Sequence, residues 1–298
     1  MSQTVAIITP AFRAQATIVA TVRSVLAQTH ADWQLWIIAD DGADYAGQLA
    51  AMGIADSRII HIDSGGIGRG AAHARNCALA RLSTPYAAIL DADDRFKPDK
   101  LARAVAALAD HAIVTTALDV VDEGFRHLRH VGQGPDKALT PGQHKWVSFS
   151  MDSMLVWDRR RADARYDLTM SNMTDLEFLL QLYRAVPASF HLGTPLHDYV
   201  KRPASMSNGA HVAAGMIASK TTLLRRLAAD HYGLPAADVA GLVRFLEISL
   251  AAEPLYAPAL ADRPGLLFED HLEPRLQQAQ TQKPAREGPA MLSGTPQS

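Results

Sequence analysis

The sequence has few of the features that would assign it to several common protein classes. Cys77 is the only cysteine among 298 residues, which excludes an intramolecular disulfide and fits a cytoplasmic location. No apolar run reaches the length of a membrane span, and the N-terminus lacks the basic and then apolar layout of a signal peptide. A formal net charge of -2 gives no electrostatic argument for nucleic acid as a partner. We therefore expect a cytoplasmic protein with no transmembrane segment, for which peripheral contact with a membrane-bound substrate stays open.

The order of apolar patterns along the chain predicts an α/β fold. A hydrophobic content of 48% is ample for a core. Over the first ~120 residues, short apolar runs alternate with segments of helical spacing, which favours a mostly parallel central sheet with helices on both faces. The expected strands cover residues 5–8, 33–38, 58–62, 86–90 and 113–116, and the expected helices begin near residues 18, 71 and 101.

The second half of the chain is less regular. Residues 131–144, rich in Gly, Pro and polar side chains, predict a mobile loop, and a strand at 154–157 and a helix at 175–183 follow. Ala- and Leu-rich patterns over 212–231 and 236–252 predict a helical C-terminal segment. We expect a domain over 1–207, with a nucleotide-binding half (1–120) and an acceptor or catalytic half (121–207), then a helical extension (208–270) and a disordered tail (271–298).

The acidic loop, Asp91 to Asp94, is the most informative stretch. It places three carboxylates within four residues, directly after the apolar run at 86–90. Such a cluster needs a counter-ion, and hard cations such as Mg²⁺ or Mn²⁺ prefer oxygen ligands and bind substrate phosphates too. Ligands of open α/β sheets bind beyond the carboxyl ends of the strands. The alternative is an ordinary turn or a helix cap, with Asp94 or Asp99 capping a helix from about Lys100.

Five sequence blocks in order resemble family-2 glycosyltransferases, which have the GT-A fold. The resemblance covers residues 4–207 and rests on these blocks: 5–12 (VAIITPAF), 37–42 (IIADDG), 70–76 (GAAHARN), 86–94 (YAAILDADD) and 174–180 (TDLEFLL). It implies a nucleotide-diphosphate sugar as donor, a carbohydrate or glycolipid acceptor, and Mn²⁺ or Mg²⁺ as cofactor.

The resemblance also implies roles for individual residues. The first block would hold the nucleoside through Thr9, Pro10, Ala11 and Phe12, and Asp41 would accept from the imide N–H of uracil. Arg75 matches a nucleotide-contacting arginine. Asp91, Ala92 and Asp93 match the family's Asp-x-Asp motif, in which the first acid usually faces ribose and the second the metal; we expect Asp93 and Asp91 as metal ligands.

Asp175 is the expected general base. The family's Glu-Asp pair opens a helix, and here Thr174-Asp175 occupies that place, with Thr in the position of the usual first acid. The alternative is a carboxylate that only favours the helix N-terminus. Glu177 is a second candidate base, although it lies about 200° further round the helix.

Other features have simpler explanations. The run of glycines at 65–70 does not match the G-x-G-x-x-G spacing and is interpreted as a flexible loop beside the donor. His144, His191 or His197 could add a metal ligand, although a lone histidine is more often structural. Val200 stands where the family commonly has Arg, so the role of Lys201 and Arg202 stays open. The arginines at 159–161 and 165 could contact an anionic acceptor, but a solvated helix face is the simpler explanation.

The predicted function is a metal-dependent, inverting glycosyltransferase that uses a nucleotide-diphosphate sugar, with UDP as the expected nucleotide, in the synthesis of a polysaccharide, glycolipid or other glycoconjugate. Two alternatives remain. One is a sugar nucleotidyltransferase, which usually has a Gly-rich, basic signature after the first strand that Thr9-Pro10-Ala11-Phe12 lacks. The other is a non-catalytic binding protein of the same fold.

Overall fold

A computed structural model describes residues 3–149, 152–201 and 212–281. Within these residues one sheet contains ten strands in the order β3-β2-β1-β4-β9-β6-β10-β5, with β7 paired to β6 and β8 paired to β10. The strands are β1 (Val5–Ala11), β2 (Trp33–Ala39), β3 (Ile59–Asp63), β4 (Tyr86–Ile89), β5 (Arg95–Phe96), β6 (Ile113–Val121), β7 (His127–Val131), β8 (Lys137–Leu139), β9 (Leu155–Asp158) and β10 (Ser189–Val200).

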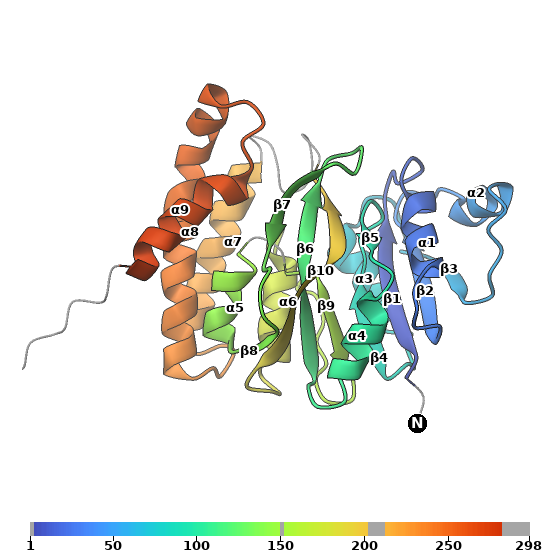
Figure 1. The fold of residues 1–298 in the computed structure, drawn as a ribbon, viewed down its shortest axis with the longest axis horizontal. Coiled ribbons are helices and arrows are strands. Elements are labelled where there is room, and N and C mark those ends of the chain that lie inside the picture. Colours follow the sequence, from blue (N-terminus) through green and yellow to red (C-terminus); the bar gives the residue numbers. More distant parts are fainter. Residues whose placement is uncertain (1–2, 150–151, 202–211, 282–298) are drawn as a thin grey trace, which may run out of the picture.

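The direction of the strands gathers the loops of interest at one edge of the sheet. β1 is parallel to β2 and β4, and β2 is parallel to β3. β9 is antiparallel to both β4 and β6, and β6 is parallel to β10, so β6 and β10 run in the same direction as the first four strands. The prediction of a mostly parallel α/β sheet is confirmed, since these six strands share one direction. Their carboxyl ends all lie at the upper edge in Figure 1.

Alternation of side chains along the strands builds a core on each face of the sheet. Ile7 and Leu35 point to one face, where they pack with α1 (Ile18–Leu26), α2 (Tyr45–Ala51) and α4 (Lys100–Ala107). Ile8 and Ile38 point to the other face, towards α3 (Ala71–Leu79) and α6 (Thr174–Leu182). Residues of a strand alternate between faces, so one apolar run supplies both cores.

The C-terminal helices continue the second core. They are α7 (Val212–Ala228), α8 (Ala236–Asp262) and α9 (Phe268–Thr281), and they form one side of the molecule beside α5 (Pro141–Val147) (Figure 1). Glycines let α5 and α8 approach closely: a Cβ at Gly241 would lie 2.7 Å from the carbonyl oxygen of Gly142. The indole of Trp146 donates to the carbonyl of Gly241 at 3.1 Å. None of the helices in the described ranges is long and apolar enough to cross a bilayer.

Several stretches differ from the sequence expectations. The loop predicted over 131–144 is wrong in part, because it contains β8 and the start of α5, where Thr140 and Gln143 form a capping box before Pro141. β10, a strand of 12 residues, was not predicted. Residues 271–281 of the segment expected to be disordered belong to α9, because Leu272 and Leu276 are buried against the core. Residues 282–298 lie outside the described ranges.

Candidate active site

Arg75 brings together two of the predicted site carboxylates. Its Nη2 donates to Oδ1 of Asp91 at 2.6 Å, and its Nη1 donates to Oδ1 of Asp175 at 3.1 Å. The three residues come from α3, from the acidic loop after β4, and from the first turn of α6. Only 5% of the Arg75 side chain is exposed, against 30% for Asp91 and 26% for Asp175. The guanidinium is therefore a buried support, and the two carboxylates face the accessible side of the site.

Tyr166, which the sequence did not single out, completes this cluster. Its hydroxyl donates to the same Oδ1 of Asp175 at 3.0 Å. The side chain of Asn76 fixes the Tyr166 backbone in both directions, donating to its carbonyl at 2.8 Å and accepting from its N–H at 2.9 Å. The Tyr166 ring stacks on Phe178 of α6 at 4.5 Å between centroids. The adjacent residues Arg75 and Asn76 thus position Asp175, one directly and the other through Tyr166.

The electrostatics of Asp175 suit a proton acceptor. Burial raises the pKa of Asp175 above its usual value, the nearby Asp91 adds to this, and Arg75 and the Tyr166 hydroxyl oppose it. A general base works best when its pKa lies close to the working pH, so a raised carboxyl pKa favours this role. Both contacts engage Oδ1, so an acceptor hydroxyl can approach Oδ2. The N-terminus of α6 also favours negative charge at this position.

The acidic loop divides its carboxylates between two sides. Asp91 and Asp93 are partly exposed, whereas Asp94 is 1% exposed and turns into the protein. Asp94 Oδ2 lies 3.0 Å from Nε2 of His197, whose Nδ1 lies 2.9 Å from Nζ of Lys100. Burial raises the pKa of Asp94 well above its usual range and lowers that of Lys100 to about 7. Asp94 therefore anchors the loop from within, whereas Asp91 and Asp93 lie on its partly exposed side.

Asp41 forms a second group with residues of the first loop. Its Oδ2 accepts from the Arg13 backbone at 2.6 Å and from the Tyr45 hydroxyl at 2.9 Å, and its Oδ1 accepts from the Ala43 backbone at 3.1 Å. Burial works to raise the pKa of Asp41, but these hydrogen bonds hold it below its usual value. β1 separates this group from the acidic loop, because it lies between β2 and β4. Asp41 and Asp91 therefore follow two strands that are separated by β1.

Asp40, which the sequence analysis left without a role, shapes the glycine-rich loop. Its carboxylate accepts from the Ser64 hydroxyl at 2.6 Å and from the backbone N–H groups of Arg69 and Gly70 at 3.0 and 2.8 Å. The folded loop reaches the ring of Phe12, which lies 3.9 Å from the position of a Cβ at Gly68. Phe12 is 46% exposed, an arrangement suited to stacking on a flat ligand.

The remaining predicted nucleotide contacts differ in accessibility. Thr9 and Ala11 belong to β1 and are fully buried, and Ala92 is buried as well. Pro10 is partly exposed. Of the four predicted residues of the first loop, Pro10 and Phe12 are therefore the two that a ligand can reach.

Several other candidates make structural contacts. His144 contacts Asp152, and His191 lies between the Thr115 hydroxyl and the Gly132 carbonyl. Lys201 is paired with Glu269 at 3.0 Å. Arg159 donates to the carbonyls of Leu82 and Thr84, and Arg160 and Arg165 pair with Asp158 and Asp163. Arg202 lies outside the described residues.

Glu177, the second candidate base, faces away from Asp175. It is 1% exposed and contacts Gln181 at 2.7 Å and Arg226 of α7 at 3.2 Å. The separation of about 200° between Asp175 and Glu177 around the helix predicts that the two side chains face different directions. Glu177 serves the contact between α6 and the C-terminal helices.

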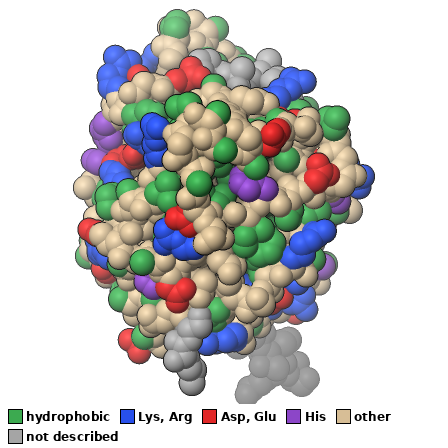
Figure 2. Space-filling model, turned by 90° about the vertical axis from the view of Figure 1, so that its right-hand side faces the viewer, with side chains coloured by type: hydrophobic (Ala, Val, Ile, Leu, Met, Phe, Trp, Pro, Cys, Tyr) green, Lys and Arg blue, Asp and Glu red, His purple; other side chains and the backbone are tan. Residues whose placement is uncertain are grey.

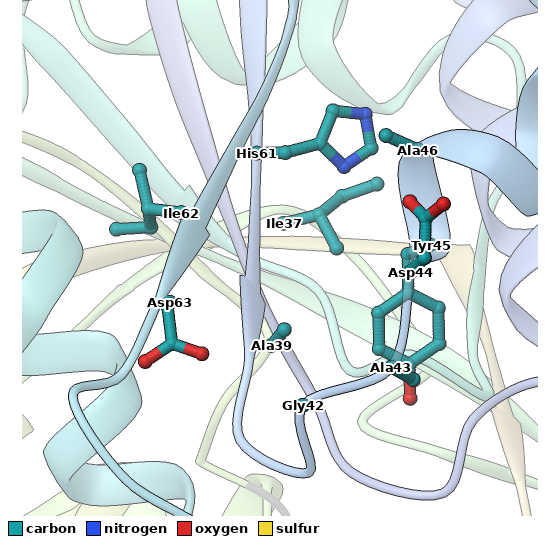
Figure 3. Close-up of a pocket in the computed structure, with 10 residues that line it drawn as sticks. All are labelled: Ile37, Ala39, Gly42, Ala43, Asp44, Tyr45, Ala46, His61, Ile62 and Asp63. Atoms are coloured by element: carbon teal, nitrogen blue, oxygen red, sulfur yellow. The ribbon is translucent and has the colours of Figure 1, made fainter.

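A hollow of about 230 Å³ opens beside the Asp41 group, between the ends of β2 and β3 and the start of α2 (Figure 3). His61 of β3 and Asp44 before α2 flank it, and burial lowers the pKa of His61. None of the predicted site residues lines this hollow. On the side of the molecule drawn in Figure 2, basic and acidic side chains are interspersed with apolar ones.

Solved structures share this fold. Staphylococcus aureus TarS 1-349 in complex with UDP-GlcNAc superposes with a TM-score of 0.65 at 14% identity, covering 93% of this chain and 79% of that one. The mannosyltransferase PcManGT of Pyrobaculum calidifontis, in complex with GDP-Man and Mn²⁺, gives a TM-score of 0.56 at 14% identity, with 93% and 78% covered. The chain has the GT-A glycosyltransferase fold.

The sequence itself identifies the family. Residues 6–171, more than half of the chain, match the model of glycosyl transferase family 2, so the chain belongs to that family. The glucosyltransferase WfgD of Escherichia coli, which uses UDP-Glc and alpha-D-GlcNAc-diphosphoundecaprenol, is 40% identical over 97 residues, or 33% of this chain and 38% of that protein. The succinoglycan biosynthesis protein ExoO of Rhizobium meliloti is 33% identical over 129 residues, with 42% and 36% covered. The matched segments thus span well under half of these relatives.

Proposed function

We propose that this protein is an inverting glycosyltransferase that moves a sugar from a nucleotide-diphosphate donor to an acceptor hydroxyl. One observation carries the proposal: Arg75 joins the Asp-x-Asp residue Asp91 to Asp175 at the carboxyl edge of the parallel strands. This shared contact supports Asp91 as the proposed donor-side acid and Asp175 as the proposed base of one site. The family match and this pairing favour transfer over the alternatives of nucleotidyl transfer and ligand binding without turnover.

The nucleoside would bind along the edge formed by β1 and β2. Phe12 offers an exposed ring for stacking, and Asp41, kept ionised by its hydrogen bonds, is a hydrogen-bond acceptor suited to the imide N–H of uracil. UDP is the proposed nucleotide, in keeping with the UDP-Glc named for WfgD and the UDP-GlcNAc of the TarS complex.

A divalent cation fits the acidic loop. Asp91 and Asp93 are partly exposed carboxylates beside the proposed diphosphate position, and oxygen ligands of this kind suit Mn²⁺ and Mg²⁺. Asp93 would be the main ligand, as the resemblance to the family's Asp-x-Asp motif implies, and Asp91, which accepts from Arg75 through Oδ1, would be the second. Bound there, the cation would offset the charge that develops on the leaving nucleotide.

The chain's own residues would carry the transfer step. Asp175 accepts the proton of the acceptor hydroxyl as that oxygen forms a bond to the anomeric carbon, and the bond from that carbon to the diphosphate oxygen breaks on the opposite face. The electron pair of the broken bond leaves with the nucleotide diphosphate, and the anomeric configuration inverts. Arg75 and Tyr166 keep the carboxylate in place for this attack.

The acceptor is proposed to be a carbohydrate, either free or carried on a lipid diphosphate. The support is the alpha-D-GlcNAc-diphosphoundecaprenol in the name of WfgD and the succinoglycan biosynthesis in the name of ExoO. Membrane contact would then be peripheral, through the acceptor.

A donor panel tests the proposal. UDP-, GDP- and dTDP-sugars are incubated with the full chain and Mn²⁺, and binding is followed by thermal shift while released nucleotide diphosphate is quantified. We expect a UDP-sugar to raise the melting temperature and to yield UDP, through transfer to an acceptor or slow hydrolysis. Release of pyrophosphate from UTP and a sugar phosphate would instead indicate nucleotidyl transfer. Binding of a donor without any release would indicate a binding protein.

A further inference from the structure

The hairpin of β6 and β7 carries two histidines and an aspartate on one face. Asp119 of β6 is directly opposite His130 of β7 in the strand register. Residues three apart in a regular strand point to opposite faces, so His127 and His130 should not meet. Val120 of β6 pairs with Arg129 of β7, and the next residue, Val121, pairs with His127. The register therefore shifts between these two pairs, and Leu128 is left as an extra residue in β7. This bulge brings His127 to the same face as His130.

The donor atoms of the three side chains converge. The ligand atoms of Asp119, His127 and His130 all lie within 4.8 Å of one another. Nδ1 of His127 is 3.5 Å from Oδ1 of Asp119, and Nδ1 of His130 also contacts that oxygen. Among the described residues, Oδ1 of Asp119 is buried and accepts no well-aligned hydrogen bond. A carboxylate oxygen faced by two imidazole nitrogens is the arrangement that a shared cation would complete.

We propose that Asp119, His127 and His130 form a surface binding site for a first-row transition metal ion of the Zn²⁺ type. Zn²⁺ takes histidine nitrogen and carboxylate oxygen at about 2.0–2.2 Å, which requires donors about 3.3 Å apart in a tetrahedron. Imidazole ligands select such ions over Mg²⁺, which prefers oxygen alone. The side chains of His127 and His130 are 48% and 42% exposed, so an ion can enter and keep an open position for water or a ligand.

Lys97 is the competing cation, and it has an alternative partner. Its Nζ contacts Oδ2 of Asp119 and also lies 3.6 Å from Oδ1 of Asp198. Asp198 lies beside Asp119 in the adjacent strand β10. When a metal ion takes Asp119, Lys97 can therefore keep a carboxylate partner. The site uses none of the residues proposed to bind the donor or its cation, and it would bind Zn²⁺ in the absence of nucleotide.

Calorimetry with Zn²⁺ alone tests the site on the full chain without nucleotide. The informative variant is the double substitution His127→Ala and His130→Ala, which changes two exposed side chains. His231→Ala is the matched control, because His231 is exposed in the connection between α7 and α8. Asp93→Ala shows whether the ion binds at the acidic loop instead. Co²⁺ serves as a second probe, since its visible absorption reports histidine ligation in a tetrahedral site.

We expect the double variant to lose one equivalent of Zn²⁺ or to bind it at least ~10-fold more weakly. His231→Ala and Asp93→Ala should keep this equivalent, and Zn²⁺ should raise the melting temperature of the wild type but not of the double variant. Unchanged Zn²⁺ affinity in the double variant would overturn the proposal. So would loss of this equivalent in Asp93→Ala, which would assign the ion to the acidic loop.

Discussion

The guanidinium of Arg75 binds the carboxylate of Asp175 across 100 positions of sequence, with Nη1 and Oδ1 3.1 Å apart. The same guanidinium also binds Asp91 at 2.6 Å. Two carboxylates that would repel each other share one buried cation, which fixes their relative position before any substrate arrives. A change at Arg75 should therefore disturb the donor side and the acceptor side of the site together.

Asp175→Asn should abolish transfer while leaving donor binding intact. The amide cannot accept a proton, and a general base contributes about 10²- to 10⁴-fold in rate. The measurement is the transfer rate together with the Kd of the UDP-sugar. Glu177→Gln is the matched control on the same helix, and it should keep its transfer rate because Glu177 faces Arg226. If Asp175→Asn kept substantial turnover, proton loss through another group would have to replace our assignment.

Tyr166→Phe should shift the acidic limb of the pH–rate profile to higher pH. The Tyr166 hydroxyl stabilises the charged form of Asp175 and so lowers its pKa, whereas burial raises it. Without this hydrogen bond the pKa rises further, the base is protonated over a wider range, and kcat/KM falls below the new pKa but recovers above it. The phenylalanine keeps the stacking on Phe178. Identical limbs in wild type and variant would show that Asp175 does not control the profile.

Much of the fold could be predicted from the sequence, because β1 and β4 are apolar runs buried on both faces and β2 is an apolar run with one largely buried face. β10 could not, since it contains His191, His197 and Asp198, which suit a buried strand only through partners elsewhere in the chain. His197, for example, is buried because Asp94 and Lys100 contact its two nitrogens. Hydrophobicity along the chain carries no signal for such pairs.

In the candidate site, too, local patterns indicate single residues but not the contacts between them. The Asp-x-Asp motif and the Thr174-Asp175 pair are local patterns, so a resemblance could indicate Asp91 and Asp175 as separate candidates. Their connection through Arg75, and the part played by Tyr166, depend on how α3 meets the loop before α6. Asn76 was the available signal, since a polar residue next to Arg75 on a packed helix requires a hydrogen-bonding partner.

Asp93→Ala should remove the Mn²⁺ dependence of UDP binding without unfolding the protein. Asp93 is partly exposed, so its loss should change the free energy of unfolding by less than about 1 kcal/mol. Calorimetry with UDP in the presence and absence of Mn²⁺ measures the first effect, and thermal unfolding measures the second. Affinity that stays unchanged in the presence of Mn²⁺ would remove Asp93 as a ligand.

Asp94→Ala should act mainly on stability. Removing Asp94 leaves His197 and Lys100 buried without their carboxylate and leaves the Val200 N–H without its acceptor. A buried polar group left without its hydrogen-bond partner costs about 1–3 kcal/mol. Asp99→Ala, at an exposed carboxylate close by in sequence, should change stability by less than about 0.5 kcal/mol. Equal stabilities of the two variants in urea unfolding would refute the internal role of Asp94.

Arg129→Met should loosen α9 while leaving the sheet intact. Arg129 of β7 pairs with Asp270 and, at 2.8 Å, with Glu273, and its own side chain is only 14% exposed. Because the two carboxylates are more than a third exposed, we expect the substitution to lower the free energy of local unfolding of α9 by only about 1 kcal/mol. Hydrogen exchange should show faster exchange of the α9 amides, with those of β1 and β4 unchanged.

Arg126→Met is the matched control, because Arg126 lies on the same hairpin with 81% of its side chain exposed and pairs only locally with Asp122. Equal exchange of α9 in both variants would show that Leu272 and Leu276 alone hold the helix.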